Sequence, residues 1–451
     1  MTNEITWRLE HDKIGPLLRH YAVPAVIGTM VNALYNIVDR IFIGQGVGAL
    51  AISGLTLTFP IMILLQGFGM LVGAGAATRI SIFLGRKEND QAEHVLGNAL
   101  ILTFLLCLLG IIPSMLFMKD MLQWFGGSEL TIPYAEEYLY IAIPANLLAS
   151  LSFSFNAIMR ASGYPKKAMY LMLLGAVLNV ILDPIFIFGF DMGIKGAAIA
   201  TVISMAVSAY FVLRHFTRKD SLIRFKKVYF RLNWPIILSI VAIGISPFAM
   251  QVAGSLVNVV MNNALYTNGG DLAVGANGIV SSIGLLVFML TMGIAMGMQP
   301  IVGFNHGAGH QKRVQDTLKL VILLNTGIMT VGFICGVFFP ELLVKGFTND
   351  PELVRLSADG LRISMAVFFV VGSQISITQF FQSIGVAWKA IFMSLSRQFI
   401  FLIPAIIIFP PYFGLNGVWM AYPFSDIAAA LTGWILLFLH VRKMKRLRAE
   451  A

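Results

Sequence analysis

Charged residues are scarce in this sequence. Asp, Glu, Lys and Arg make up 12% of the 451 residues, whereas roughly 25% is typical of a soluble domain. Hydrophobic residues make up 57%, and the mean hydropathy is +0.81. So few charged residues cannot cover the water-exposed surface of a globular protein of this length. The composition therefore excludes a soluble globular protein and predicts a multi-pass membrane protein.

Cysteine is nearly absent, and so are the motifs of catalysis. The two cysteines, Cys107 and Cys335, both lie in apolar runs, which excludes a disulfide framework. His306 and His310 stand in a Gly-rich segment that supplies no further metal ligands. The sequence contains no phosphate loop, nucleophile elbow or catalytic dyad. We therefore expect neither an enzyme nor a cofactor.

Long apolar runs are what the sequence has in abundance. A hydrocarbon core of about 30 Å needs roughly 20 residues of helix. Twelve such runs lie at residues 17–43, 50–83, 95–117, 135–159, 168–188, 196–216, 236–266, 273–303, 317–339, 357–381, 389–409 and 417–440. The predicted fold is an all-α integral membrane protein with twelve transmembrane helices.

Basic residues gather on one side of these twelve spans. With the N-terminus in the cytoplasm, the inner segments hold the basic clusters 214–231 and 442–448. The outer segments hold only Lys119, Lys195, Lys345 and Arg355. By the positive-inside rule, both termini are expected to be cytoplasmic. The net charge of +10 is then a topology signal and a contact for anionic membrane lipids, and no nucleic-acid partner is expected.

The two halves of the chain resemble each other. The segment ASGYPKKA at 161–168 recurs 222 positions later as SIGVAWKA at 383–390. Three glycines recur 224 positions later, namely Gly69, Gly73 and Gly85 as Gly293, Gly297 and Gly309. Each half has six helices, so the repeats run parallel, and substrate is expected in a central cavity between them. The predicted organisation is a first lobe at 1–213, a basic cytoplasmic linker at 214–235 and a second lobe at 236–451.

The acidic residues that lie clearly inside the spans, away from their ends, are Asp39, Asp183 and Asp426. Asn179 lies one helical turn before Asp183, on the same helix face. Asp39, Asp183 and Thr201 are expected at a similar depth, roughly 6–8 Å below the outer ends of their helices. Their oxygens would suit a hard cation, or a proton shared between two carboxyl groups.

Two structural interpretations stand beside this one. Asp39 could pair with Arg40, although adjacent residues on a helix point about 100° apart. Asp426 is expected to form a structural ion pair with Arg397, which lies in the preceding span and is taken as the only deeply placed base.

The motifs together resemble the multidrug and toxic compound extrusion (MATE) family, over essentially the whole chain. They are LYNIVDRIFIG around Asp39, the pattern Asn179-x-x-x-Asp183-Pro184, and GIKGAAIAT ending in Thr201. The resemblance implies export of amphipathic, often cationic drugs in exchange for inward Na⁺ or H⁺. It also implies that the coupling ion is bound by Asp39, Asn179, Asp183, Thr201 and the backbone carbonyl of Ala197.

Within that family the sequence is most similar to the DinF-like branch. The NorM-like branch carries acidic residues in the seventh and tenth spans. Here residues 236–266 contain none, and Asp359 lies at the outer edge of the tenth span. The resemblance thus implies a coupling-ion site in the first lobe, and the sequence leaves Na⁺ and H⁺ both open.

Other classes of membrane protein fit less well. A lipid-linked glycan flippase of the same superfamily would have basic residues in its cavity and often fourteen spans. A channel would need a pore-loop signature, which is absent. The expected protein is a monomeric exporter of the bacterial cytoplasmic (inner) membrane.

Overall fold

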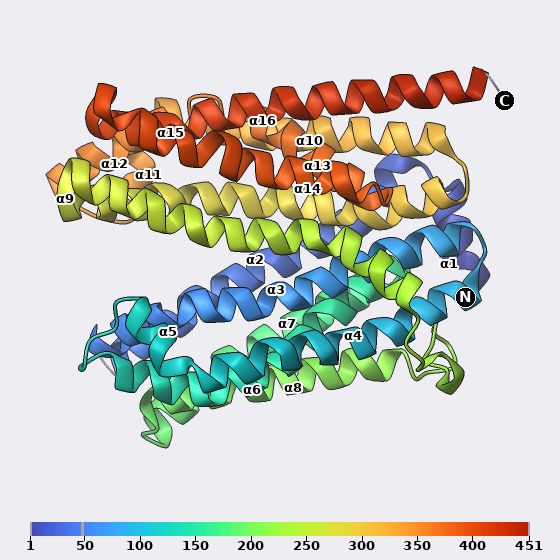
Figure 1. Cartoon of the computed structure of the whole chain (residues 1–451), viewed down its shortest axis with the longest axis horizontal. Helices are drawn as coiled ribbons and strands as arrows, with labels where there is room; N and C mark the ends of the chain where they lie inside the picture. Colours follow the sequence, from blue (N-terminus) through green and yellow to red (C-terminus); the bar gives the residue numbers. More distant parts are fainter. Residues whose placement is uncertain (1, 47–48, 450–451) are drawn as a thin grey trace.

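The computed structural model describes residues 2–46 and 49–449, and these form helices joined by turns and by a longer linker between α8 and α9 (Figure 1). The first half contains α1 (Thr2–His11), α2 (Ile14–Gly46), α3 (Ala49–Gly85), α4 (Asn89–Leu116), α5 (Met118–Trp124), α6 (Ile132–Ala161), α7 (Pro165–Pro184), η1 (Ile185–Gly189) and α8 (Gly193–His215). The short η2 (Lys227–Tyr229) lies in the linker. The second half contains α9 (Trp234–Gly307), α10 (Gln311–Phe338), α11 (Pro340–Val344), α12 (Pro351–Ser364), α13 (Phe369–Ser383), α14 (Ala387–Leu395), η3 (Ser396–Leu402), α15 (Ile403–Ile408) and α16 (Pro410–Ala449).

The prediction of twelve membrane-spanning helices is confirmed. Within the described ranges, nine helices are long and apolar enough to cross a membrane, and the bent pair α12 and α13 makes a tenth span. The 74-residue α9 is broken at Gly270, where φ is +66°, so it supplies two spans instead of one. The 33-residue α2 is also long enough to cross the bilayer. These two additions bring the number of spans to twelve.

The break within α9 lies where the sequence predicts the end of one span and the start of the next. Gly270 has a non-helical backbone and separates the predicted spans 236–266 and 273–303. One predicted span differs in detail from the structure, because 357–381 is two helices, α12 and α13, which meet at 56°. Hydropathy does not report this bend, because the bend leaves the apolar pattern intact.

The α-helical hydrogen-bond pattern loosens to π-helix at two places. Pro184 has no N–H to donate and is followed at once by the π-helical segment η1. The second segment, η3, contains Arg397 and ends just before Pro404. Each of the two polar residue groups predicted from the sequence therefore lies beside a departure from regular α-helix.

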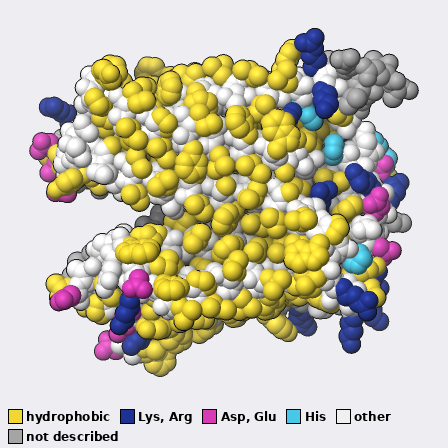
Figure 2. Space-filling view, viewed as in Figure 1, with side chains coloured by type: hydrophobic (Ala, Val, Ile, Leu, Met, Phe, Trp, Pro, Cys, Tyr) yellow, Lys and Arg dark blue, Asp and Glu magenta, His cyan; other side chains and the backbone are white. Residues whose placement is uncertain are grey.

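The helices form two lobes with a cleft between them. Figure 1 shows α2–α8 in one lobe and the helices from α9 onward in the other. Figure 2 shows a deep notch between the lobes at one end of the molecule. At the opposite end, which carries both termini in Figure 1, the lobes meet. The molecule thus has one open end and one closed end.

Glycines allow close helix contact at the closed end. A Cβ atom at Gly244 of α9 would lie 1.9 Å from the carbonyl oxygen of Leu71 on α3, and one at Gly75 would lie 2.1 Å from that of Ile240. Gln299 of α9 also donates a hydrogen bond across the lobes to the Thr78 hydroxyl, at 2.8 Å. Small residues let backbones approach in this way in membrane proteins.

The surface has the distribution of a membrane protein. In Figure 2, hydrophobic side chains cover the flanks of both lobes, while Lys, Arg, Asp and Glu gather at the two ends. Large apolar side chains such as Leu109, Val259 and Phe438 are each 65% exposed. An apolar surface of this extent is stable only in lipid.

Candidate functional site

The most deeply buried acid of the first lobe is Asp183, in the last turn of α7. Its side chain is fully buried, and Asn179, one turn earlier, is 2% exposed. The amide Nδ2 of Asn179 donates to Oδ1 of Asp183 at 3.2 Å and to Oγ1 of Thr201, on α8, at 3.2 Å. One amide therefore joins the carboxyl of α7 to the hydroxyl of the next helix.

Asp39 reaches the same place from α2. Its carboxyl lies close enough to that of Asp183 for the two negative charges to repel each other. The phenol of Tyr138, on α6, also lies within the electrostatic reach of both acids. Four helices, α2, α6, α7 and α8, thus converge on one acidic cluster.

Ala197 lies one turn before Thr201 on α8 and is fully buried. It belongs to an apolar cluster with Ile43, Leu55 and Ile187, against which Tyr138 packs. Asp39, Asn179, Asp183 and Thr201 are thus close together, with Ala197 on the adjoining turn. The side chain of Arg40, the alternative partner of Asp39, lies outside the part that the structure describes.

The cluster has acceptor capacity to spare. Oδ1 of Asn179 is buried without a hydrogen-bond partner, and a buried acceptor in that state costs about 1–3 kcal/mol. Among the described residues, there is no group of three or more His, Cys, Asp or Glu side chains that could hold a metal ion. Two carboxyl groups, an amide oxygen and a hydroxyl suit a singly charged cation, either H⁺ or Na⁺.

The acid of the second lobe is already neutralised. Asp426 of α16 is 3% exposed, and its Oδ1 accepts from Nε of Arg397 at 2.8 Å and lies 2.8 Å from a terminal guanidinium nitrogen. Asp359 is exposed and pairs with Arg362 at 3.2 Å. Neither acid therefore offers a charge to a coupling ion.

Sequence reasoning missed three polar residues of the spans. Arg79 of α3 and Arg160 of α6 also lie within spans, so Arg397 is not the only base in the transmembrane part. Tyr138 could not be identified from the sequence, because a tyrosine in an apolar run does not reveal which residues of other helices it contacts. Only the packing of α6 against α7 and α8 brings it to the acids.

Two parallel helical repeats, a cleft open at one end and a buried acidic cluster in one lobe are the arrangement of a membrane transporter rather than of an enzyme. The MatE family model matches residues 24–185 and again residues 247–408, 223 positions later. The chain belongs to the MatE family, the MATE transporters. The double match confirms the two predicted parallel repeats.

The alignments with similar proteins cover nearly the whole chain. Multidrug export protein MepA of Staphylococcus haemolyticus is 28% identical over 443 residues, which are 98% of this chain and 97% of MepA. A solved structure of the MATE multidrug transporter DinF-BH is 37% identical, with a TM-score of 0.87, and the match covers 94% of this chain and 95% of that one. A MATE crystal structure in complex with MaL6 has a TM-score of 0.92 at 23% identity, over 97% and 99% of the two chains, and shows the shared fold.

Proposed function

We propose that this transporter exports amphipathic, often cationic drugs in exchange for H⁺ or Na⁺. The observation that carries the proposal is the buried contact between Asp39 and Asp183 in one lobe of a cleft-bearing transporter. The MatE family match and the similarity to MepA and DinF-BH support the drug substrates. No cofactor is part of the mechanism.

The chemistry of the acidic cluster favours H⁺ over Na⁺. Two carboxylates cannot both stay ionised at close range in a buried site without a large repulsion. One proton shared as a hydrogen bond between the carboxyl groups of Asp39 and Asp183 would remove this repulsion. Loss of that proton would leave two negative charges on adjacent helices and drive α2 away from α7.

Movement of α2 provides a route from ion to drug. This helix packs against both α7 and, in the other lobe, α9. A Cβ atom at Gly293 or Gly297 of α9 would lie within 2.5 Å of atoms of Val26 or Ala22 on α2. A shift of α2 at the acidic cluster would thus change its contact with the second lobe. Drug and ion would compete through the position of this one helix.

The orientation in the membrane is part of the same proposal. We place both termini in the cytoplasm of a bacterial cell, in the inner membrane, because the basic linker after α8 and the end of α16 lie at the closed end (Figure 1). The cleft then faces outward. The first lobe extends over 1–213, the linker over 214–235 and the second lobe over 236–451, with residues 1, 47, 48, 450 and 451 outside the described part. A monomer, surrounded by membrane lipids, contains the complete site.

Efflux of ethidium from cells tests the proposal. Wild type is compared with Asp183→Asn at matched expression, and Asp359→Asn is the control because it changes an exposed acid of the other lobe. We expect Asp183→Asn to lose efflux to the level of cells without the transporter, and the control to keep it. A protonophore should stop wild-type efflux if H⁺ is the coupling ion, whereas replacement of Na⁺ should stop it if Na⁺ is. Full efflux by Asp183→Asn would contradict the ion-site assignment, and absence of efflux in wild type would contradict the drug substrates.

A further inference from the structure

The two repeats place a lysine, an aromatic ring and a histidine together at equivalent turns. In the first lobe, Nζ of Lys167 lies 4.9 Å from the ring centroid of Tyr164, and His215 packs edge-on against that ring at 4.5 Å. In the second lobe, Nζ of Lys389 lies 4.9 Å from the ring of Phe381, and His440 packs edge-on at 5.5 Å. Both turns lie at the closed end. They differ in how the positive charge is balanced.

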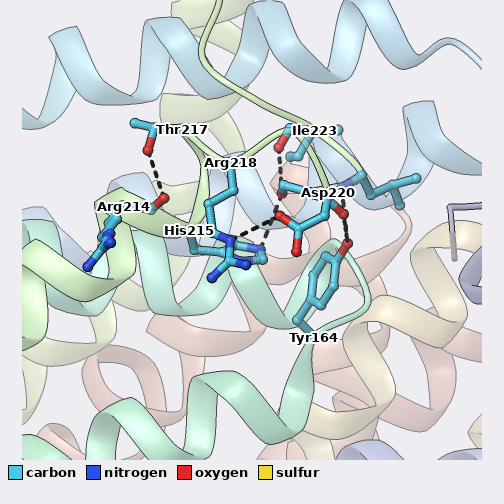
Figure 3. A network of polar contacts seen from close by, with 9 residues as sticks. Tyr164, Arg214, His215, Thr217, Arg218, Asp220 and Ile223 are labelled. Carbon is cyan, nitrogen blue, oxygen red and sulfur yellow. Dashed lines mark hydrogen bonds and ion pairs between the residues drawn. The ribbon is translucent and has the colours of Figure 1, made fainter.

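In the first lobe the linker supplies the balancing acid. Asp220 lies beside this turn, where its carboxylate accepts from Nε of Arg218 at 3.0 Å and its backbone carbonyl accepts from the Tyr164 hydroxyl at 3.3 Å (Figure 3). The hydrogen bond from Arg218 holds the pKa of Asp220 below its usual range. Asp220 therefore stays ionised within electrostatic reach of Lys167 and His215.

In the second lobe the equivalent lysine has no such acid among the described residues. Lys389 is 9% exposed, and its ammonium makes one long hydrogen bond, 3.5 Å to the carbonyl of Leu436. Its charged neighbour Lys443 is a base that opposes its charge, and the adjacent His440 supplies no negative charge. None of the ion pairs found in the described part of the chain includes these three residues. A buried ammonium without a counter-charge is unfavourable.

A groove of about 440 Å³ opens beside this ammonium, between α14 and α16. Lys389, His440 and Lys443 line one part of it, and Leu436 and Leu439 line another. Trp388, also in its wall, is 62% exposed, as tryptophans at the headgroup level of a bilayer are. The groove thus combines a basic end with an apolar wall at the edge of the membrane-facing surface.

We propose that this groove binds the phosphate headgroup of an anionic membrane lipid. The phosphate supplies to Lys389 and Lys443 the negative charge that Asp220 supplies in the first lobe. A lipid fits better than a free phosphate, because the wall continues into exposed apolar residues such as Phe392 and Ile435, 42% and 59% exposed, along which an acyl chain can lie. Basic pockets between helices on the cytoplasmic side are suited to such headgroups.

Native mass spectrometry of the full chain in detergent tests the site. The protein is offered an equal mixture of phosphatidylglycerol and phosphatidylcholine, and the bound lipids are counted. We expect wild type to prefer phosphatidylglycerol. Removal of one lysine charge should lower that binding about fivefold, and removal of both, in Lys389→Gln with Lys443→Gln, roughly 25-fold.

Three variants separate binding from folding. Lys167→Gln is the matched control, because it changes the equivalent lysine of the other lobe, and it should leave phosphatidylglycerol binding unchanged. Lys443→Gln alone changes an exposed side chain and should reduce binding even if the double variant fails to fold, while Lys389→Arg should retain it. Equal binding of both lipids by wild type, unchanged binding by Lys443→Gln, or displacement of the lipid by excess inorganic phosphate would each overturn the proposal.

Discussion

The ion pair of Arg397 and Asp426 allows a sharp test of how the second lobe is stabilised. Asp426 is 3% exposed, and two guanidinium nitrogens lie 2.8 Å from its Oδ1. The variant Asp426→Asn keeps the shape of the side chain and removes its charge, which leaves Arg397 largely buried without a counter-charge. Breaking a buried pair in this way costs about 3–5 kcal/mol of unfolding free energy.

The structure supplies a matched control in the same lobe. Asp359 and Arg362 form a pair at 3.2 Å, but their side chains are 47% and 45% exposed. Solvent screens an exposed pair, so Asp359→Asn should cost only about 0–1 kcal/mol. Both variants can be compared with wild type by unfolding the purified protein from mixed micelles with a denaturing detergent, and by its thermal midpoint.

A double variant distinguishes the ion pair from simple packing. Arg397→Met with Asp426→Leu removes both charges, so no unpaired charge remains and the stability should recover much of the loss. The reasoning is refuted if Asp426→Asn is no less stable than Asp359→Asn. It is also refuted if the double variant is less stable than Asp426→Asn alone.

Two further predictions concern the closed end. Gly244→Ala places a methyl group 1.9 Å from the backbone of Leu71, so it should destabilise the protein by about 1–3 kcal/mol and reduce efflux. Gly254→Ala on the same helix meets no atom within 4 Å and should do neither; equal effects would contradict the contact. Arg313 of α10 donates to the backbone carbonyls of Leu9 and Asp12 at 3.0 and 2.8 Å, so Arg313→Gln should speed amide exchange in α1, whereas the exposed Lys312→Gln should not. Unchanged exchange in Arg313→Gln would show that this contact does not hold α1.

Much of the fold follows from the sequence because a bilayer reduces the choice of structure. The apolar runs and the recurrence of ASGYPKKA as SIGVAWKA are visible in the residues alone, and both correspond to helices and turns of the structure. The break of α9 at Gly270 also falls between the two predicted spans 236–266 and 273–303. The bend between α12 and α13 is not visible in the sequence, since it does not alter hydropathy.

The candidate site shows the same division. Asn179 and Asp183 could be paired from their spacing, since one helical turn places them together whatever the rest of the fold does. The contact of Asp39 with Asp183 depends on how α2 packs against α7, and the place of Tyr138 depends on α6. Such contacts between distant segments leave no local pattern. The similar depth of the acids and the family resemblance together predicted that Asp39 and Asp183 lie close, whereas nothing in the sequence predicted the position of Tyr138.

The two lobes share one fold but balance their buried charges in opposite ways, and this asymmetry gives the transport cycle a direction of control. In the second lobe, Asp426 has a protein cation beside it in Arg397. In the first lobe, Asp183 faces a second acid, Asp39, and in the proposed mechanism its charge is balanced by the coupling ion. Under that mechanism, a change of ion occupancy alters the forces on the helices of the first lobe alone. Helices α2 and α3 of that lobe touch α9 through glycines at the closed end. The first lobe can therefore move relative to the second, which keeps its own structure. Neutralising Asp426 should thus affect stability more than ion dependence, and neutralising Asp183 the reverse.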